Sequence, residues 1–123
     1  MRDHNQLSAF ELADELLLMI YKHKRNFPKE EIYGLVSQMR RAAVSVPSNI
    51  VEGCAREGKR EYIHFLEIAF GSLRELHYQF ILATRLGYIE DNNKSDVVMK
   101  IIETEKVLGA LIRALNNPKH LQT

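Results

Sequence analysis

The sequence has 123 residues, of which 46% are hydrophobic and 27% are charged, and its formal net charge is +1. This length fits one domain with one core, and this composition excludes an intrinsically disordered chain. A net charge so close to zero neither favours nor excludes nucleic acid as a partner. The charge is unevenly distributed, because residues 22–60 carry nine basic and four acidic side chains and sum to +5, whereas residues 1–21 sum to −3.

Cysteine content and hydropathy predict a cytoplasmic protein. Cys54 is the single cysteine, which excludes an intramolecular disulfide and fits a reducing compartment. The N-terminal residues mix acidic with apolar side chains and do not resemble a signal peptide. The longest apolar run, residues 16–21, is far too short to cross a membrane, so no membrane partner is expected.

Apolar residues recur at three- and four-residue spacing in four segments, which predicts amphipathic helices over residues 6–24, 29–53, 59–86 and 93–115. No segment alternates apolar and polar residues with period two, so no strand is predicted. Pro47 lacks an N–H and clashes with the carbonyl four residues earlier, so we expect the second helix to be kinked or broken there. Together these features indicate an all-α protein, an antiparallel up-down-up-down four-helix bundle that forms a single domain over residues 1–123.

The second predicted helix separates into two faces on a helical wheel. Its apolar face belongs to the core and holds Leu35, Met39, Ala43, Val46, Ile50 and Gly53. Its polar arc favours short hydrogen-bonding side chains over the Lys/Glu mixture of a solvated face, and it holds Gln38, Arg41, Ser45, Ser48, Asn49, Glu52 and Arg56. We predict a partly buried polar network between helices or subunits, made by Arg41, Ser45, Asn49, Glu52 and Arg56. The alternatives are an ordinary solvated face and a site for a polar ligand.

The first and third predicted helices carry wider apolar arcs than a monomeric bundle needs, which indicates contact between subunits. The opposite face of the third helix mixes both charge signs and holds Arg60, His64, Glu67, Arg74, Glu75, Tyr78 and Arg85. Solvation with local ion pairing is the simplest interpretation of that face. The alternative is that it packs against the Arg41/Glu52 arc of a neighbouring copy.

Two short motifs resemble ligand-binding sequences but lack the required context. Glu61-Tyr-Ile-His64 has the spacing of a di-iron ligand pair, yet no second Glu-x-x-His exists in the chain. Residues 53–60 resemble a phosphate-binding loop, yet Arg60 stands where Ser or Thr is needed and no strand precedes it. Cys54 and the five histidines form no catalytic or ligand set. We therefore expect no metal, no cofactor and no enzymatic activity.

One longer pattern covers the second and third predicted helices. It consists of Phe27-Pro-x-x-Glu31-x-x-Gly34-Leu35-x-x-Gln38-x-Arg40-Arg41-Ala42-x-x-Ser45-Val46-Pro47-x-Asn49-Ile50-x-Glu52-Gly53, followed by Phe65-Leu-x-Ile-Ala-x-Gly71-Ser72-Leu73-x-Glu75-Leu76. This pattern resembles the signature of the bacterial proteins encoded in intervening sequences of 23S rRNA genes and of their stand-alone relatives, over most of residues 8–115.

The resemblance implies a left-handed up-down bundle that assembles into a homopentamer, similar also to the accessory protein of diversity-generating retroelements. In that relative, the pentamer binds nucleic acid and a reverse transcriptase through a basic surface, and the family has no established catalytic activity. The expected function is therefore a non-catalytic, homopentameric interaction module. It would contact RNA or DNA through the basic residues Arg25, Lys29, Arg56, Lys59 and Arg60. The alternative is a protein–protein scaffold or adaptor without nucleic-acid affinity, and an enzyme ranks third.

Overall fold

The computed structural model describes residues 1–23, 26–89 and 91–118, and for residues 91–95 it describes the backbone alone. Four α-helices make up most of this part of the chain: α1 (Ser8–Lys22), α2 (Leu35–Cys54), α3 (Lys59–Arg85) and α4 (Asp91–Asn116). Two short 3₁₀ helices, η1 (His4–Gln6) and η2 (Lys29–Glu31), precede α1 and α2. The described residues contain no strand, so the predicted all-α four-helix class is confirmed.

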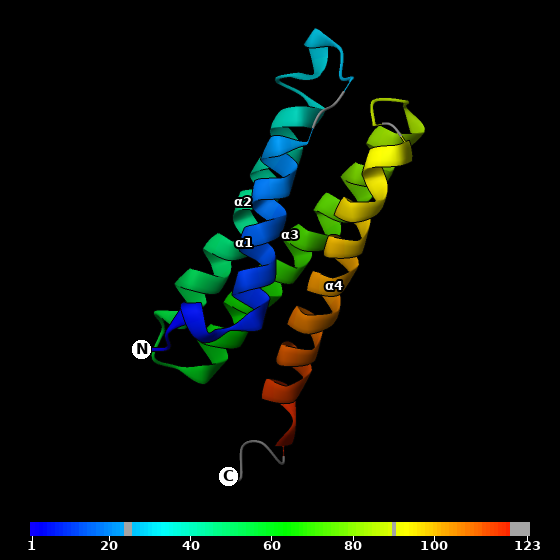
Figure 1. The fold of residues 1–123 in the computed structure, drawn as a ribbon. Helices are drawn as coiled ribbons and strands as arrows, with labels where there is room; N and C mark the ends of the chain where they lie inside the picture. Colours follow the sequence, from blue (N-terminus) through cyan, green and yellow to red (C-terminus); the bar gives the residue numbers. More distant parts are fainter. Residues whose placement is uncertain (24–25, 90, 119–123) are drawn as a thin grey trace.

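Successive helices run in opposite directions along one bundle (Figure 1). The helices contact one another in the cyclic order α1–α2–α3–α4, and α4 returns to contact α1. Among the described residues, the backbones of α1 and α3, or of α2 and α4, do not come into close contact across the centre. The side chains of all four helices fill that centre instead. None of the described helices combines the length and apolar character needed to cross a bilayer.

The core lies along the axis of the bundle and draws on every helix. Its largest fully buried side chains are Leu16 and Ile20 of α1, Met39 and Ile50 of α2, Leu66, Leu73, Leu76 and Phe80 of α3, and Ile101 and Leu108 of α4. Burying one such side chain stabilises the fold by roughly 1.5–3 kcal/mol. The predicted core face of α2 is confirmed at Met39, Ala43, Val46, Ile50 and Gly53, all of which are buried, and Leu35 packs against the core while half-buried.

The start of α2 differs from the predicted helix over residues 29–53. Lys29–Glu31 forms the separate turn η2, and the α-helix begins only at Leu35, after Gly34. Gly34 has a non-helical backbone conformation, with φ −106° and ψ −109°, and this separates the two segments. The side chain of Glu31 then caps the new start, because its Oε1 accepts a hydrogen bond from the Leu35 N–H at 3.2 Å.

Pro47 lies inside one continuous α2, so the predicted break at this position is wrong, while a kink stays a prediction. A proline removes one intrahelical hydrogen bond, and here its ring is buried. Burial of the ring and of the helix face around it is what keeps the segment helical on both sides.

The remaining boundaries lie within a few residues of those predicted. The helix expected over residues 6–24 is α1, which begins at Ser8 after η1 and the extended Leu7, while residue 24 lies outside the described residues. The end of α3 is fixed by Gly87, whose φ of +79° suits a glycine after a helix. The N–H of Gly87 donates to the Thr84 carbonyl and the N–H of Tyr88 to the Ala83 carbonyl, which completes a Schellman cap.

Candidate interaction surfaces

A small polar cluster lies at the contact between α2 and α3. The Oγ atoms of Ser45 and Ser72 lie 2.7 Å apart, one on each helix, and both residues are half-buried. Asn49 donates from its Nδ2 to the Ser45 Oγ at 2.9 Å and to the Ser45 carbonyl at 2.8 Å. Ser45 and Asn49 therefore meet within one chain. Their partner Ser72 was not among the residues predicted for the polar network, although a small polar side chain inside a long helix is a signal for a close helix contact.

The other predicted members of the network lie apart from this cluster. Arg41 is exposed and donates from its Nη2 to the Gln38 Oε1, and no carboxylate among the described residues lies within ion-pair distance of it. Arg56, just beyond the end of α2, pairs with Glu52 of α2 at 2.8 Å, and both side chains are about half exposed. Within one chain, then, the five residues form three separate groups. The network between subunits stays a prediction.

The predicted nucleic-acid contacts divide between the two ends of the bundle. Lys29 lies in η2 at one end, whereas Arg56, Lys59 and Arg60 lie around the connection between α2 and α3 at the opposite end (Figure 1). Arg25 lies outside the described residues. The predicted set therefore does not form one continuous surface on a single chain, and its larger part is the group formed by Arg56, Lys59 and Arg60.

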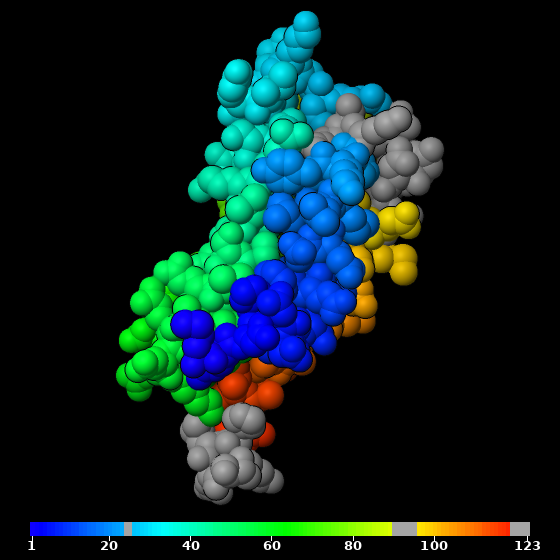
Figure 2. Space-filling model, turned by 60° about the vertical axis from the view of Figure 1, so that its left-hand side comes forward, coloured from blue at the N-terminus to red at the C-terminus, as the bar shows by residue number. Residues whose placement is uncertain are grey.

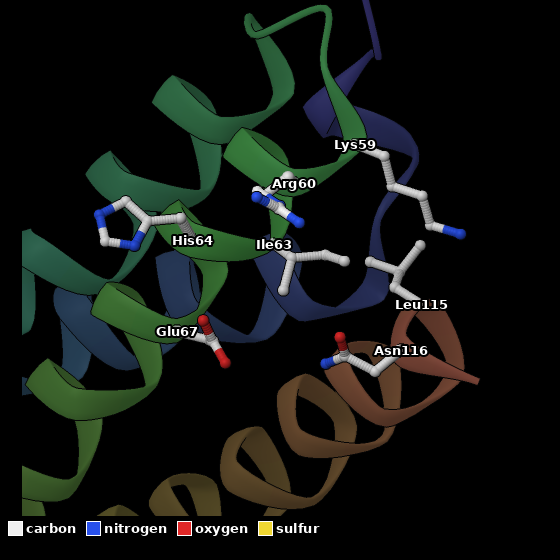
Figure 3. Close-up of a pocket in the computed structure, with 7 residues that line it drawn as sticks. All are labelled: Lys59, Arg60, Ile63, His64, Glu67, Leu115 and Asn116. Atoms are coloured by element: carbon white, nitrogen blue, oxygen red, sulfur yellow. The ribbon is translucent and has the colours of Figure 1, made fainter. Parts of the chain in front are cut away.

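A hollow of about 530 Å³ lies beside this basic end, between α3 and α4. It is lined by Lys59, Arg60, Ile63, His64 and Glu67 of α3, and by Leu115 and Asn116 of α4 (Figure 3). Leu115 and Asn116 extend toward Ile63 across the gap, while His64 lies on the far side of α3 (Figure 3). The lining holds the cations Lys59 and Arg60 and the carboxylate of Glu67, and it can accommodate a small polar group.

No candidate metal site emerges among the described residues, where no three side chains from His, Cys, Asp and Glu cluster closely enough to hold an ion. Glu61 and His64, which share the spacing of di-iron ligands, are both exposed on the surface of α3. They therefore do not point into the bundle core, as ligands of a di-iron site would.

The end of α2 is held by the N-terminal segment. The Arg2 N–H donates to the Cys54 carbonyl at 3.0 Å, and the Arg2 Nη1 donates to the Arg56 carbonyl at 2.7 Å. The negative end of the α2 dipole stabilises a cation at this position. The Arg2 guanidinium also lies 4.1 Å from the centre of the Tyr62 ring.

Cys54 itself is buried in this corner, and burial raises the pKa of its thiol from the ordinary 9.0, although the nearby Arg2 lowers it in part. Its thiol is therefore protonated at neutral pH, which is the unreactive form. The residue packs as a small apolar side chain.

One group of exposed apolar side chains occupies the side of the bundle formed by α1 and α2. The Arg40 guanidinium lies 4.8 Å from the centre of the Tyr21 ring, and this contact aligns the two antiparallel helices. Leu18 lies one turn before Tyr21, and Val44 lies one turn after Arg40. Leu18 and Val44 therefore lie at the same height along the bundle axis. We call the set Leu18, Tyr21, Val44 and Val51 the α1/α2 face; all four side chains are between 37% and 50% exposed. Figure 2 looks onto this side, where α1 (blue) lies against α2 (cyan to green).

A second group occupies the side formed by α3 and α4. Glu105 of α4 accepts a hydrogen bond from Arg74 at 2.9 Å, and its Oε2 lies 2.9 Å from the Nδ1 of His77, so these residues align the two helices. One turn beyond them, Ile81 of α3 comes level with Ile102 of α4. We call the set Tyr78, Ile81 and Ile102 the α3/α4 face; its side chains are between 38% and 58% exposed.

Comparison with known proteins bears on both the family and the fold. No curated protein matches the chain. Among solved structures, the chain is similar to a protein of unknown function from the S23 ribosomal protein family of Bacteroides thetaiotaomicron, with 23% identity and a TM-score of 0.75. The similarity covers 85% of this chain and 95% of the other, and it establishes a shared fold. The sequence model for 23S rRNA-intervening sequence proteins matches residues 5–110, and the chain therefore belongs to the 23S rRNA-intervening sequence protein family.

Proposed function

We propose that this protein is a non-catalytic, homo-oligomeric interaction module of the cytoplasm, with five copies in the assembled particle. The observation that carries the proposal is the exposure of large apolar side chains in two groups, the α1/α2 face and the α3/α4 face. Grouped apolar side chains on the surface of a soluble helical bundle are typical of contact between proteins. The number five comes from the family resemblance.

Native mass spectrometry and light scattering test the assembly directly. The expected particle has five times the 14.3 kDa of one chain. It should dissociate on dilution into smaller species rather than remain at one mass, because its stability depends on protomer concentration. A monomer of 14.3 kDa at every concentration would contradict the proposal.

A second candidate function is the binding of RNA or DNA at the basic end of the bundle. Arg56, Lys59 and Arg60 gather there beside the hollow between α3 and α4, and Arg60 is exposed to solvent. Assembly into a ring would bring several copies of this end together, which strengthens attraction to phosphates. The partner would then be recognised mainly through its backbone.

The salt dependence of binding tests this second function. Affinity for a short duplex or single strand should fall steeply as salt rises, because each phosphate contact releases counterions. The double variant Lys59→Gln/Arg60→Gln should reduce the salt slope, whereas Lys29→Gln, at the other end of one chain, is the control. A flat salt response, or no binding at low salt, would leave a protein–protein adaptor as the better explanation. A nuclease-insensitive stoichiometric protein partner would support that adaptor.

A further inference from the structure

Two hollows adjoin on the side of the bundle between α3 and α4. The hollow beside the basic end has a volume of about 530 Å³. The second has a volume of about 350 Å³ and is lined by Glu67 and Phe70 of α3 and by Gly109, Ile112 and Arg113 of α4. Glu67 lines both hollows, so they meet at this residue, and we call them together the Ile63/Ile112 groove. From Lys59 to Phe70 the groove follows α3 over roughly 16 Å, at about 1.5 Å per residue.

The floor of the groove is apolar and only partly covered. Its side chains are each half-buried: Ile63 and Phe70 of α3, and Ile112 and Leu115 of α4. Gly109 keeps space open beside Phe70, because a Cβ at this position would enter the groove and lie 3.5 Å from the Phe70 Cε2. Covering the remaining apolar surface stabilises a complex by about 25 cal/mol per Å². An apolar body lying on this floor is therefore favoured.

The rim of the groove is basic. It holds the three cations Lys59, Arg60 and Arg113 against the one carboxylate of Glu67, and three positive charges with one negative charge leave a net +2. None of these four side chains forms an ion pair within the described part of the chain. In Figure 3, Lys59 and Arg60 stand above Ile63, so the two cations of α3 lie at the end of the apolar floor.

Carboxylates outside the groove do not cancel this charge. Glu57 and Glu61 are closest in sequence to the two cations of α3, but neither of them lines the groove. Glu105 of α4 lies one turn before Gly109, and its carboxylate is already paired with Arg74 at 2.9 Å. The groove therefore combines a positive end with an apolar floor, which is the complement of an anion that carries an apolar body.

We infer that the Ile63/Ile112 groove binds a small amphipathic anion, a molecule with one negatively charged group and one apolar body. This ligand site goes beyond the proposed assembly and does not depend on it. The charged group lies at Lys59 and Arg60, and the apolar body extends over Ile63 toward Phe70. Glu67 stands between the two hollows and repels a second negative charge further along, so the groove favours a monoanion over a polyanion. The volumes of both hollows lie within the roughly 300–1,000 Å³ of small-molecule sites.

Anilinonaphthalene sulfonate, a fluorescent dye with one sulfonate on an aromatic body, is the probe for this site. Titration of the full chain should show saturable binding of one dye per chain, with an emission shifted to the blue. Decanoate should displace the dye, whereas decyltrimethylammonium, which has an alkyl chain but the opposite charge, should not. Inorganic phosphate at the same concentration as decanoate should also fail, because it lacks an apolar body.

Two variants separate the two parts of the groove. The double variant Lys59→Gln/Arg60→Gln removes the cations that hold the charged group. Ile63→Gln removes an apolar side chain from the floor without changing the charge. Each should raise the dissociation constant of the dye at least about tenfold, because the ligand needs both the charge and the apolar floor.

Each variant has a matched control outside the groove. Lys22→Gln/Lys29→Gln also removes two exposed cations, and both lie at the opposite end of the bundle. Ile68→Gln changes an isoleucine that is 39% exposed on α3 but lies one turn before Ser72, on the side that faces α2. Both controls should bind the dye like the wild type. Near-UV circular dichroism and urea unfolding of every chain establish that the dye is bound by the folded protein.

Each outcome decides the inference. It is overturned if the wild type shows no saturable binding, or if decyltrimethylammonium or phosphate displaces the dye as readily as decanoate. It is also overturned if the double variant loses affinity while Ile63→Gln does not, since the site then responds to charge alone, as contacts to nucleic-acid phosphates do. Native mass spectrometry measures the particle separately. A monomeric chain that still binds the dye refutes the proposed assembly and supports this inference.

Discussion

Ser45 and Ser72 face each other between α2 and α3, with their Oγ atoms 2.7 Å apart. Asn49 donates to the Ser45 Oγ from the next turn of α2, so three small polar side chains share one hydrogen-bonded group. Apolar side chains of the core lie next to this group, and it therefore satisfies polar atoms that burial would otherwise leave without partners. It also links α2 to α3 at a defined level of the two helices.

Replacing Ser72 should weaken the fold measurably. Ser72→Ala removes one partner of the half-buried Ser45 hydroxyl and should lower the free energy of unfolding by about 1 kcal/mol. Urea unfolding at neutral pH measures the change. Ser37→Ala, at an exposed position of α2, is the control and should change the free energy by less than about 0.5 kcal/mol. Equal stability of the two variants would contradict the role given to the Ser45–Ser72 contact.

Two glycines should respond in opposite directions to alanine. A Cβ added at Gly53 would lie 2.9 Å from the Phe65 Cβ and 3.2 Å from the Tyr62 carbonyl oxygen, so Gly53→Ala forces α2 and α3 apart. We expect a loss of roughly 1–3 kcal/mol. Gly71 lies inside α3 with no atom within 4 Å of an added Cβ, so Gly71→Ala should stabilise the helix by up to about 1 kcal/mol. Thermal unfolding of both variants shows whether each change raises or lowers stability. A stabilised Gly53→Ala variant would contradict the close approach of α2 and α3 at Gly53.

The side chain of Glu31 should stabilise the start of α2. Its Oε1 accepts from the Leu35 N–H at 3.2 Å, and its Oε2 accepts from the Tyr88 hydroxyl at 3.4 Å. Glu31→Ala should therefore lower the free energy of unfolding by about 1 kcal/mol. Glu30→Ala is the matched control, because Glu30 is an exposed neighbour in the same turn. Chemical denaturation should separate the two variants, and identical midpoints would exclude the cap.

Stability should fall in alkaline solution, beginning near the unfolded pKa of the Cys54 thiol. Burial raises the pKa of the Cys54 thiol from 9.0 and the pKa of the Tyr62 hydroxyl from 10.0. Both groups therefore hold their protons more tightly in the folded chain than in the unfolded chain. Their contribution is complete below the unfolded pKa and is lost as the pH rises toward the folded pKa.

Urea unfolding measured from about pH 8 to about pH 10.5 checks this direction. The free energy of unfolding should begin to fall near pH 9, the unfolded pKa of Cys54. Cys54→Ala removes the first of the two groups. That variant should have a lower free energy of unfolding at neutral pH, because it leaves a small cavity. Between neutral pH and pH 9.5, which is within about one unit of the unfolded pKa, its free energy of unfolding should fall less than that of the wild type. A wild type whose stability rises over this range would contradict the pKa directions.

The sequence was most informative where one residue type has one structural effect. The helix period predicts the buried face of α2, because an apolar stripe along a helix faces the core. Gly87 marks the end of α3, because a positive φ after a helix is a conformation that favours glycine. The late start of α2 at Leu35 was missed, because it depends on Glu31 reaching forward to cap the helix, and helix propensity alone favours continuing through residues 29–34.

Contacts between elements were harder to predict than the elements themselves. The wheel of α2 places Arg41, Glu52 and Arg56 in one arc, but it gives no distances to α3, and the structure divides them into a pair with Gln38 and a local ion pair. The level positions of Leu18 with Val44, and of Ile81 with Ile102, depend on the registers of two helix pairs. A single sequence contains no direct information on register between helices.

Arg41 should matter more for assembly than Glu52. Arg41 is exposed on α2 with Gln38 as its hydrogen-bond partner and, among the described side chains, no carboxylate, so it is available to pair with an acid of a neighbouring copy. Glu52 already pairs with Arg56 at 2.8 Å, and an exposed ion pair of this kind contributes little to the free energy of folding or assembly. Arg41→Ala should therefore raise the dissociation constant of the particle roughly tenfold, which is about 1.4 kcal/mol, while Glu52→Gln changes it less. Analytical ultracentrifugation over a dilution series measures both. If the Arg41→Ala variant assembles as tightly as the wild type, the polar arc of α2 is ordinary solvated surface, and the contact depends on the two apolar faces alone.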